Sequence, residues 1–141
     1  METSNKVTIT VETTVQKPVA KVWKYWTEPQ HTTKWNFASD DWHAPKAEND
    51  LRVGGRFLTR MEAKDGSFGF DFSGVYDEVK IHEYISYTID DGRKVEITFI
   101  NNENNTKVIE KFEAEGSNPT EMQEAGWQAI LDNFKTYSEN L

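Results

Sequence analysis

Apolar residues recur at intervals of three and four near the end of the chain, and this spacing predicts a long C-terminal helix. The row consists of Trp127, Ile130, Leu131, Phe134, Tyr137 and Leu141. Asn118 is a favourable N-cap, Pro119 suits the first helical position, and Glu121 stands where its carboxylate can reach back to the cap. We expect a helix over residues 119–137, roughly 28 Å long, with one apolar face that needs a cover.

The beginning of the chain predicts one strand followed by two helices. Residues 7–15 alternate between apolar and polar side chains, as a half-buried strand does. Pro18 can open a helix, and apolar residues follow it at helical spacing. Pro29 ends this helix, because the residue before a proline avoids helical backbone angles. A short second helical turn is expected over residues 29–34.

From residue 51 onwards, alternation with a period of two indicates a β-meander. About five strands are expected, near residues 57–61, 68–76, 84–89, 95–99 and 106–114. The connections are short turns rich in Asp, Asn and Gly, so neighbouring strands should be antiparallel. The second of these strands would place four rings on one face, namely Phe68, Phe70, Phe72 and Tyr76.

The order of these elements, one strand, two helices, about five strands and a long helix, indicates an α+β fold. A strongly curved antiparallel sheet wrapped around the terminal helix would cover the apolar faces of both. A helix rarely fills such a sheet completely, so the remaining space would become a pocket. At 141 residues the chain is expected to form one domain, residues 1–141.

Several of these segments resemble the helix-grip fold of the SRPBCC or START-like superfamily, and within it the branch of activator of heat-shock-chaperone ATPase homologue-like proteins. The segments that carry the resemblance are residues 18–23, Trp35, residues 51–57, Gly126, Trp127, Leu131 and Phe134. The resemblance implies a cavity between sheet and terminal helix, but no fixed catalytic set. Residues 36–49 depart from the general pattern of the superfamily as a longer insert.

Composition narrows the range of partners. The chain has 24 acidic and 16 basic residues and a net charge of -8, so nucleic acid and anionic membrane are unfavourable partners. It has no cysteine, which excludes disulfides, cysteine-ligated zinc and thiol catalysis. No apolar run has the length of a signal region or a membrane span, and we expect a cytoplasmic protein.

Residues 35–43 combine rings, carboxylates and an imidazole in a segment that is expected to be a loop or a short strand. Such segments often carry function on a rigid scaffold. Two interpretations are open. Trp35, Phe37 and Trp42 could plug one end of the fold, or Trp42 and His43 could face a ligand.

Glu110 is the sharpest candidate for chemistry. It falls between Val108 and Phe112 on the expected inward row of the last strand. An acid in that position must be paired, hydrated in a pocket or protonated. The alternative is an offset strand in which Ile109 faces inward and Glu110 is a solvated charge.

The residues expected to bind a ligand therefore come from the insert, the ring-rich strand, the last strand and the terminal helix. They are Trp35, Phe37, Trp42, His43, Phe70, Phe72, Tyr76, Glu110, Trp127 and Ile130. The three histidines are too scattered for a metal site, and no phosphate loop, dinucleotide fingerprint or nucleophile motif occurs, so we expect neither a metal nor another cofactor.

Three functions follow as hypotheses. The first is a non-enzymatic protein that binds a small hydrophobic or aromatic molecule. The second is a polyketide cyclase-like or hydrolytic enzyme that uses Glu110 or His43 as acid or base. The third, implied by the resemblance, is a cochaperone-like module that interacts with a heat-shock chaperone. A homodimer is possible in each case.

Overall fold

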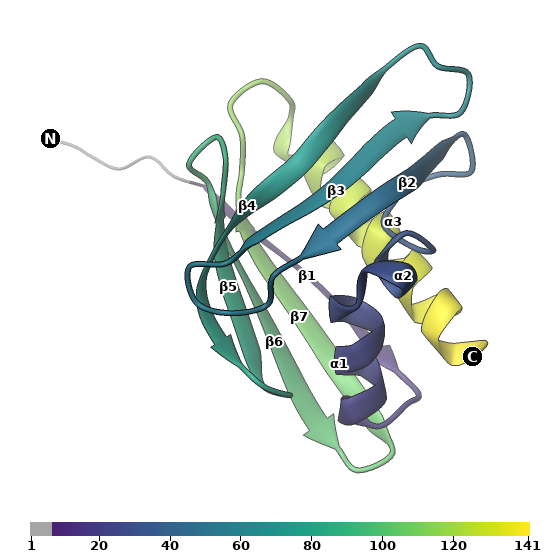
Figure 1. Ribbon diagram of the computed structural model, residues 1–141, viewed down its shortest axis with the longest axis vertical. Coiled ribbons are helices and arrows are strands. Elements are labelled where there is room, and N and C mark those ends of the chain that lie inside the picture. Colours follow the sequence, from purple (N-terminus) through teal and green to yellow (C-terminus); the bar gives the residue numbers. More distant parts are fainter. Residues whose placement is uncertain (1–6) are drawn as a thin grey trace, which may run out of the picture.

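The computed structural model describes residues 7–141. Its elements are β1 (Thr8–Val15), α1 (Val19–Thr27), α2 (Pro29–Thr32), β2 (Trp42–Asn49), β3 (Arg56–Ala63), β4 (Gly69–Lys80), β5 (Tyr84–Ile89), β6 (Lys94–Asn102), β7 (Asn105–Glu113) and α3 (Thr120–Glu139). The predicted α+β fold, with an antiparallel meander between two short helices and one long helix, is confirmed (Figure 1). No helix within the described part of the chain is long and apolar enough to cross a membrane.

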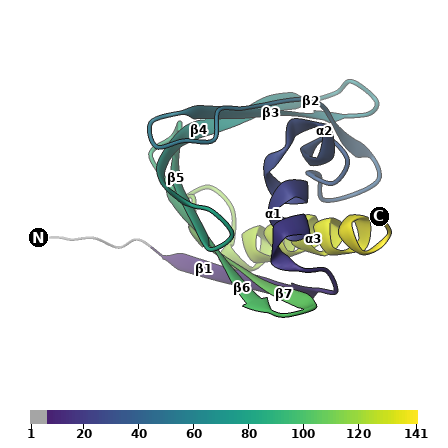
Figure 2. The ribbon, with the colours of Figure 1, turned by 60° about the horizontal axis from the view of Figure 1, so that its bottom comes forward.

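The strands form one seven-stranded sheet in the order β1-β7-β6-β5-β4-β3-β2. All neighbouring pairs are antiparallel. In this order the first two strands of the chain, β1 and β2, lie at opposite edges of the sheet. The register shifts between Tyr76 and Glu78 on β4 and between His43 and Lys46 on β2, and such irregularities bend a strand. The sheet curls so far that β2, β3 and β4 form one wall and β1, β6 and β7 another, with the helices on the concave side (Figure 2).

The packed core lies where α1 and α3 meet the concave face of the sheet. Alternation brings one row of each strand inward, and Val15, Ile97 and Val108 are fully buried. From the helices, Val22 of α1 and the α3 residues Leu131 and Phe134 are also fully buried. The expected cover for the apolar face of α3 is therefore the concave side of the sheet.

The start of α3 differs by one residue from the prediction. Thr120 is the first helical residue, and Pro119, with an extended backbone, takes the cap position without a side-chain cap hydrogen bond. Asn118 does not cap the helix because its amide group is used elsewhere: its Nδ2 donates to Glu115 Oε2 at 3.1 Å. The Asn118 carbonyl accepts a hydrogen bond of 2.8 Å from Nε2 of Gln123, and this bond ties the start of α3 to the loop before it.

Two features of the sheet also correct the prediction. The meander has six strands after α2, because residues of the insert form β2 and pair with β3 at the edge of the sheet. Phe68 precedes β4 and is 62% exposed, and Phe70 is 39% exposed, so the row of four rings is not uniformly covered. The β3–β4 hairpin extends beyond the helices, and its tip therefore lacks a cover (Figure 1).

Candidate ligand-binding site

A cavity of about 240 Å³ lies between the concave face of the sheet and the helices. Side chains of β2, β3, β4, β5, β7, α1, α2 and α3 contribute to its lining. Its lining residues are Trp26, Pro29, Thr32, Trp35, Asn36, Ala47, Glu48, Asn49, Phe57, Thr59, Met61, Phe70, Phe72, Tyr76, Tyr87, Arg93, Glu110, Trp127 and Ile130. Twelve of these residues are aromatic or aliphatic, and seven are polar or charged.

Aromatic rings in contact with one another form one wall of the cavity. The ring of Phe57 lies 4.6 Å from that of Tyr87 and 5.4 Å from that of Tyr76, measured between centroids. On α3, Trp127 stacks on Phe112 of β7 with a centroid distance of 3.9 Å and an interplanar angle of 10°. These contacts fix the rings, because aromatic pairs at such distances add to the stabilisation from burial.

Asn49 and Tyr76 form a hydrogen-bonded pair at the cavity wall. The Tyr76 hydroxyl donates to Asn49 Oδ1 at 2.6 Å, and Asn49 Nδ2 donates to the Thr27 carbonyl at 2.6 Å. Burial raises the pKa of Tyr76 well above its usual range. The pair is thus a neutral polar group that ties β4 and β2 to the end of α1.

Glu110 lines the cavity from β7 and is only 6% exposed. Val108 and Phe112, its neighbours on the same row, are buried, so the strand is not offset. The carboxylate has no hydrogen bond or ion pair to any residue within 7–141. Burial raises the pKa of Glu110 to about 8. Burial is the main cause of the raised pKa of Tyr87, and the nearby Glu110 carboxylate raises this pKa further.

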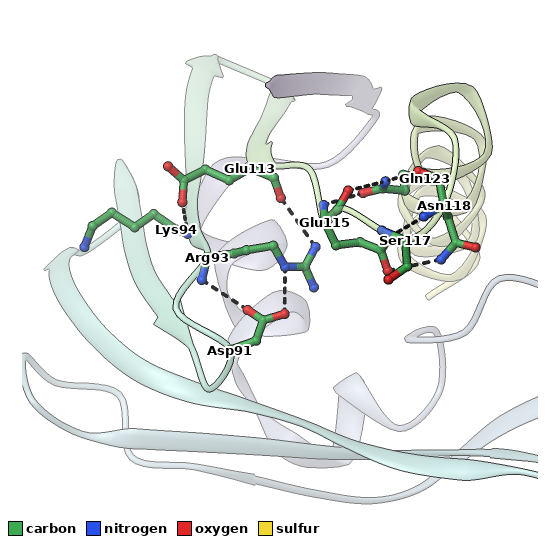
Figure 3. Close-up of polar contacts among 8 residues, drawn as sticks. All are labelled: Asp91, Arg93, Lys94, Glu113, Glu115, Ser117, Asn118 and Gln123. Atoms are coloured by element: carbon green, nitrogen blue, oxygen red, sulfur yellow. Dashed lines mark hydrogen bonds and ion pairs between the residues drawn. The ribbon is translucent and has the colours of Figure 1, made fainter. Parts of the chain in front are cut away.

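Arg93 borders the cavity near the β5–β6 turn, but its guanidinium is already engaged. Its Nε donates to Asp91 Oδ2 at 2.8 Å, and a terminal nitrogen lies 3.4 Å from the Glu113 carbonyl oxygen (Figure 3). Glu113 also accepts a hydrogen bond of 2.8 Å from the backbone N–H of Lys94. These contacts hold Arg93 at the rim between the turn and the end of β7.

The structure brings seven of the ten expected site residues together at the cavity. They are Trp35, Phe70, Phe72, Tyr76, Glu110, Trp127 and Ile130. The other three, Phe37, Trp42 and His43, are not among the lining residues. Trp42 and His43 are consecutive residues at the start of β2, an edge strand, so their side chains point to opposite faces of the sheet.

Each of these three residues has other neighbours. Phe37 borders a separate shallow hollow beside α3. Trp42 packs against Phe68 and Phe70 with ring centroids 6.0 Å apart in both pairs. His43 Nε2 lies 3.6 Å from Glu62 Oε1, with both side chains substantially exposed.

Several lining residues were not among the residues expected to bind a ligand. Phe57, Thr59 and Met61 belong to a row that alternation had already marked on β3, so this signal was available. Tyr87 lies on the strand expected near residues 84–89, where the same alternation applies. Arg93 and Asn49 had no comparable signal, because their positions depend on a turn and on the unexpected strand β2.

These features define a helix-grip domain, in which a curved sheet and a long terminal helix enclose a cavity. The chain belongs to the family described as activator of Hsp90 ATPase homolog 1-like proteins, whose family model matches residues 16–139. This finding confirms the branch that the sequence resembled. No match was found among curated proteins.

Solved structures support the assignment. The chain is 44% identical to an AHSA1-like protein from Aeromonas hydrophila, with a TM-score of 0.89 over 95% of this chain and 93% of that one. It is 55% identical to Chr148 from Cytophaga hutchinsonii, with a TM-score of 0.80 over 97% and 94% of the two chains. A protein from Chromobacterium violaceum has the same fold at 25% identity, with a TM-score of 0.84 over 94% and 98%.

Proposed function

We propose that this protein binds a small, mainly apolar molecule with an aromatic ring in the cavity between sheet and helices. The observation that carries the proposal is the cavity itself, which is lined by rings from β3, β4, β5 and α3. Ligand sites in proteins combine an apolar lining with a small number of polar groups that orient the ligand. Asn49, Tyr76, Glu110 and Arg93 are among the polar residues of the lining.

The volume limits the size of the ligand. An engineered apolar cavity of about 150 Å³ is sufficient to hold benzene. At about 240 Å³, this cavity suits a molecule of one or two rings and is smaller than the sites that hold most drug-sized ligands. Residues Pro29, Thr32 and Asn36, after α1, and Glu48 on β2 would border the opening, since Glu48 is exposed and the other three are half-buried.

Calorimetric titration with benzyl alcohol would test the proposal, together with native mass spectrometry of freshly purified protein. Wild type should bind the probe, and Ile130→Phe, which adds volume at the cavity, should weaken binding at least about tenfold. Met122→Phe adds the same side chain to α3 at a position that is 61% exposed, and it should bind like wild type. A wild type that neither binds the probe nor carries a small molecule would contradict the proposal.

An enzymatic function, of the polyketide cyclase-like or hydrolytic kind, is the second candidate. It is favoured by one observation, a buried carboxyl group in the cavity whose pKa is raised to about 8 and which could act as a general acid. His43, outside the cavity lining, offers no such support. Conversion of a copurified ligand to a product of different mass by wild type, and not by Glu110→Gln, would establish this function.

The family description supports a third candidate, an interaction with a heat-shock chaperone. The name concerns the family, and for this chain a chaperone partner stays a prediction, as does a cytoplasmic location. Stimulation of a purified chaperone's ATPase would support the interaction. An unchanged ATPase rate, with no complex in size-exclusion chromatography, would remove it.

A further inference from the structure

The carboxylate of Glu110 is buried, faces the cavity and has no partner. Among the described residues, Ser138 is the one with a fully enclosed side-chain polar atom that lacks a hydrogen bond. The Glu110 oxygens also lack a partner within that part of the chain, so they are not fully enclosed. Because Glu110 lines the cavity and is only 6% exposed, its oxygens border the cavity space.

The residues beside Glu110 on the adjoining strands cannot provide a hydrogen bond or an ion pair for its carboxylate. On the adjoining strands the residues in register are Val11 of β1, 2% exposed, and Ile97 of β6, which is fully buried. Both side chains are apolar. A buried acid without a partner destabilises the fold. A ligand that supplies a hydrogen-bond donor or a positive charge would offset this cost.

Four other titratable side chains line the cavity, and one of them, Glu48 of β2, is exposed and paired with Lys46 at 2.9 Å. Tyr76 of β4 and Tyr87 of β5 are neutral, because burial raises both pKa values well above the usual range. Arg93 is a cation, but Asp91 and the Glu113 carbonyl already accept its hydrogen bonds. On the α3 side the lining residues, Trp127 and Ile130, carry no charge.

Aromatic rings surround the same space. Phe57, Phe72, Tyr76, Tyr87 and Trp127 all line the cavity, and the ring pairs Phe57–Tyr87 and Phe72–Trp127 are in contact. Ring faces attract organic cations, and the attraction increases where water is excluded. The net charge of -8 adds a field that favours the approach of cations.

On these grounds we infer that the ligand is a small aromatic amine, whose ammonium group pairs with the Glu110 carboxylate while its ring packs against the aromatic wall. The inference rests on the proposed function, since it names the chemical class of the ligand for the same cavity. It gives Glu110 the role of a ligand-binding residue.

Binding of this kind requires the release of a proton. In the empty cavity the Glu110 carboxyl is mostly protonated at neutral pH, since its pKa is raised to about 8. The amine arrives as its ammonium form. On binding, the O–H bond of the carboxyl breaks, its proton passes to solvent, and the ammonium N–H groups donate to the carboxylate oxygens. The affinity for the amine should therefore rise by about tenfold per pH unit between about pH 6 and pH 8.

The test is calorimetric titration with benzylamine, benzyl alcohol and benzoate, which are similar in size and differ in charge. At about pH 8, wild type should bind benzylamine at least about tenfold more tightly than benzyl alcohol, as a charge-assisted hydrogen bond would give. At about pH 6, titrations in buffers of different ionisation enthalpy should show the release of about one proton per bound benzylamine.

Glu110→Gln should lose both the preference for benzylamine and the proton release, and should retain benzyl alcohol binding, which also shows that the variant is folded. Glu124→Gln is the matched control, because it makes the same change at an exposed position of α3 that does not line the cavity. This control should behave like wild type.

Three results would overturn the inference. Equal binding of benzylamine and benzyl alcohol by wild type would show that Glu110 does not select a cation. A preference for benzoate would identify Arg93 as the polar partner instead. An unchanged benzylamine preference in Glu110→Gln would place the ammonium group elsewhere. Failure of all three probes to bind would instead contradict the proposed function itself.

Discussion

The space inside the curved sheet has two regions that are both rich in rings and yet differ in packing. In the region we call the packed half, Trp23, Phe99, Leu131 and Phe134 are buried. Trp23 and Phe99 lie 5.2 Å apart between ring centroids, and neither these two nor Leu131 and Phe134 line the cavity. In the cavity half, formed by Phe57, Phe72, Tyr76, Tyr87, Glu110 and Trp127, rings of the same kind surround open space.

The difference between the halves comes from the placement of the helices. Helix α1 packs against β6 and β7, and α3 packs against β1. The rings of β3, β4 and β5 face the space that these helices leave. A carboxylate such as Glu110 would be costly in the packed half, whose residues are buried and do not line the cavity, but in the cavity half a ligand or water can reach it. Ring content alone therefore does not distinguish a core from a binding site.

The largest effect is expected from a substitution in the packed half. Phe134→Ala should destabilise the protein by about 3 to 5 kcal/mol, because the side chain is fully buried and contacts Trp26 and Trp35 at centroid distances of 4.9 and 4.8 Å. Denaturant unfolding would measure the change. Glu124→Ala, on an exposed site of the same helix, should stay within about 0.5 kcal/mol of wild type. Similar losses in both variants would disprove our assignment of the buried face of α3.

In the cavity half, Trp127→Ala should cost less, about 2 to 3 kcal/mol, although the removed side chain is larger. Trp127 is half-buried and lines the cavity, so the new void adds to an existing one. The lost stacking on Phe112 accounts for part of the cost. The same unfolding measurement applies. A loss of stability as large as that of Phe134→Ala, or larger, would mean that the cavity half is packed at least as well as the packed half.

Glu110→Gln should increase stability, in contrast to the two previous changes. The folded pKa of Glu110, about 8, exceeds the ordinary value of 4.5 for a glutamate side chain. Between these values the folded state holds a proton that the unfolded state has lost, so the stability of wild type decreases as pH rises from about 4.5 to 8. The neutral amide avoids this decrease, and the variant should be more stable by about 1 to 3 kcal/mol at about pH 7.

Thermal and denaturant unfolding of wild type and Glu110→Gln from about pH 4 to pH 9 would measure this effect. The two stability curves should converge near pH 4 and diverge as pH rises. Glu124→Gln, at an exposed position, should follow wild type throughout. Parallel curves for Glu110→Gln would show that the carboxylate is hydrated or paired and that the cavity half contains no poised acid.

The smallest effect is expected at the edge of the sheet. Trp42→Ala should change the affinity for benzyl alcohol less than about threefold, because Trp42 does not line the cavity and, of the two rings it packs against, Phe68 and Phe70, only Phe70 belongs to the lining. Phe72→Ala, which removes a ring from the cavity wall, is the comparison and should weaken binding far more. A large loss of affinity in Trp42→Ala would extend the binding site to the β3–β4 hairpin.

Much of the fold could be predicted because its signals are local. Periodicity marked α3 and the inward rows of β3 to β7, and Glu110 was recognised as an inward acid from its neighbours Val108 and Phe112. Strand β2 was missed, since its sequence alternates poorly and contains a proline, and its pairing with β3 is a long-range contact. The position of Arg93 at the cavity likewise depends on tertiary contacts that no local pattern contains.

The most direct test of two unlike halves is a titration of the five tryptophan indole N–H signals by NMR with benzyl alcohol. Trp26, Trp35 and Trp127 line the cavity, whereas Trp23 and Trp42 do not. Single Trp→Phe variants would assign the signals. We expect saturable shifts for Trp26, Trp35 and Trp127, with Trp127 most affected, and unchanged signals for Trp23 and Trp42. Shifts confined to Trp23 or Trp42, or no saturable shift in any of the five, would contradict the account.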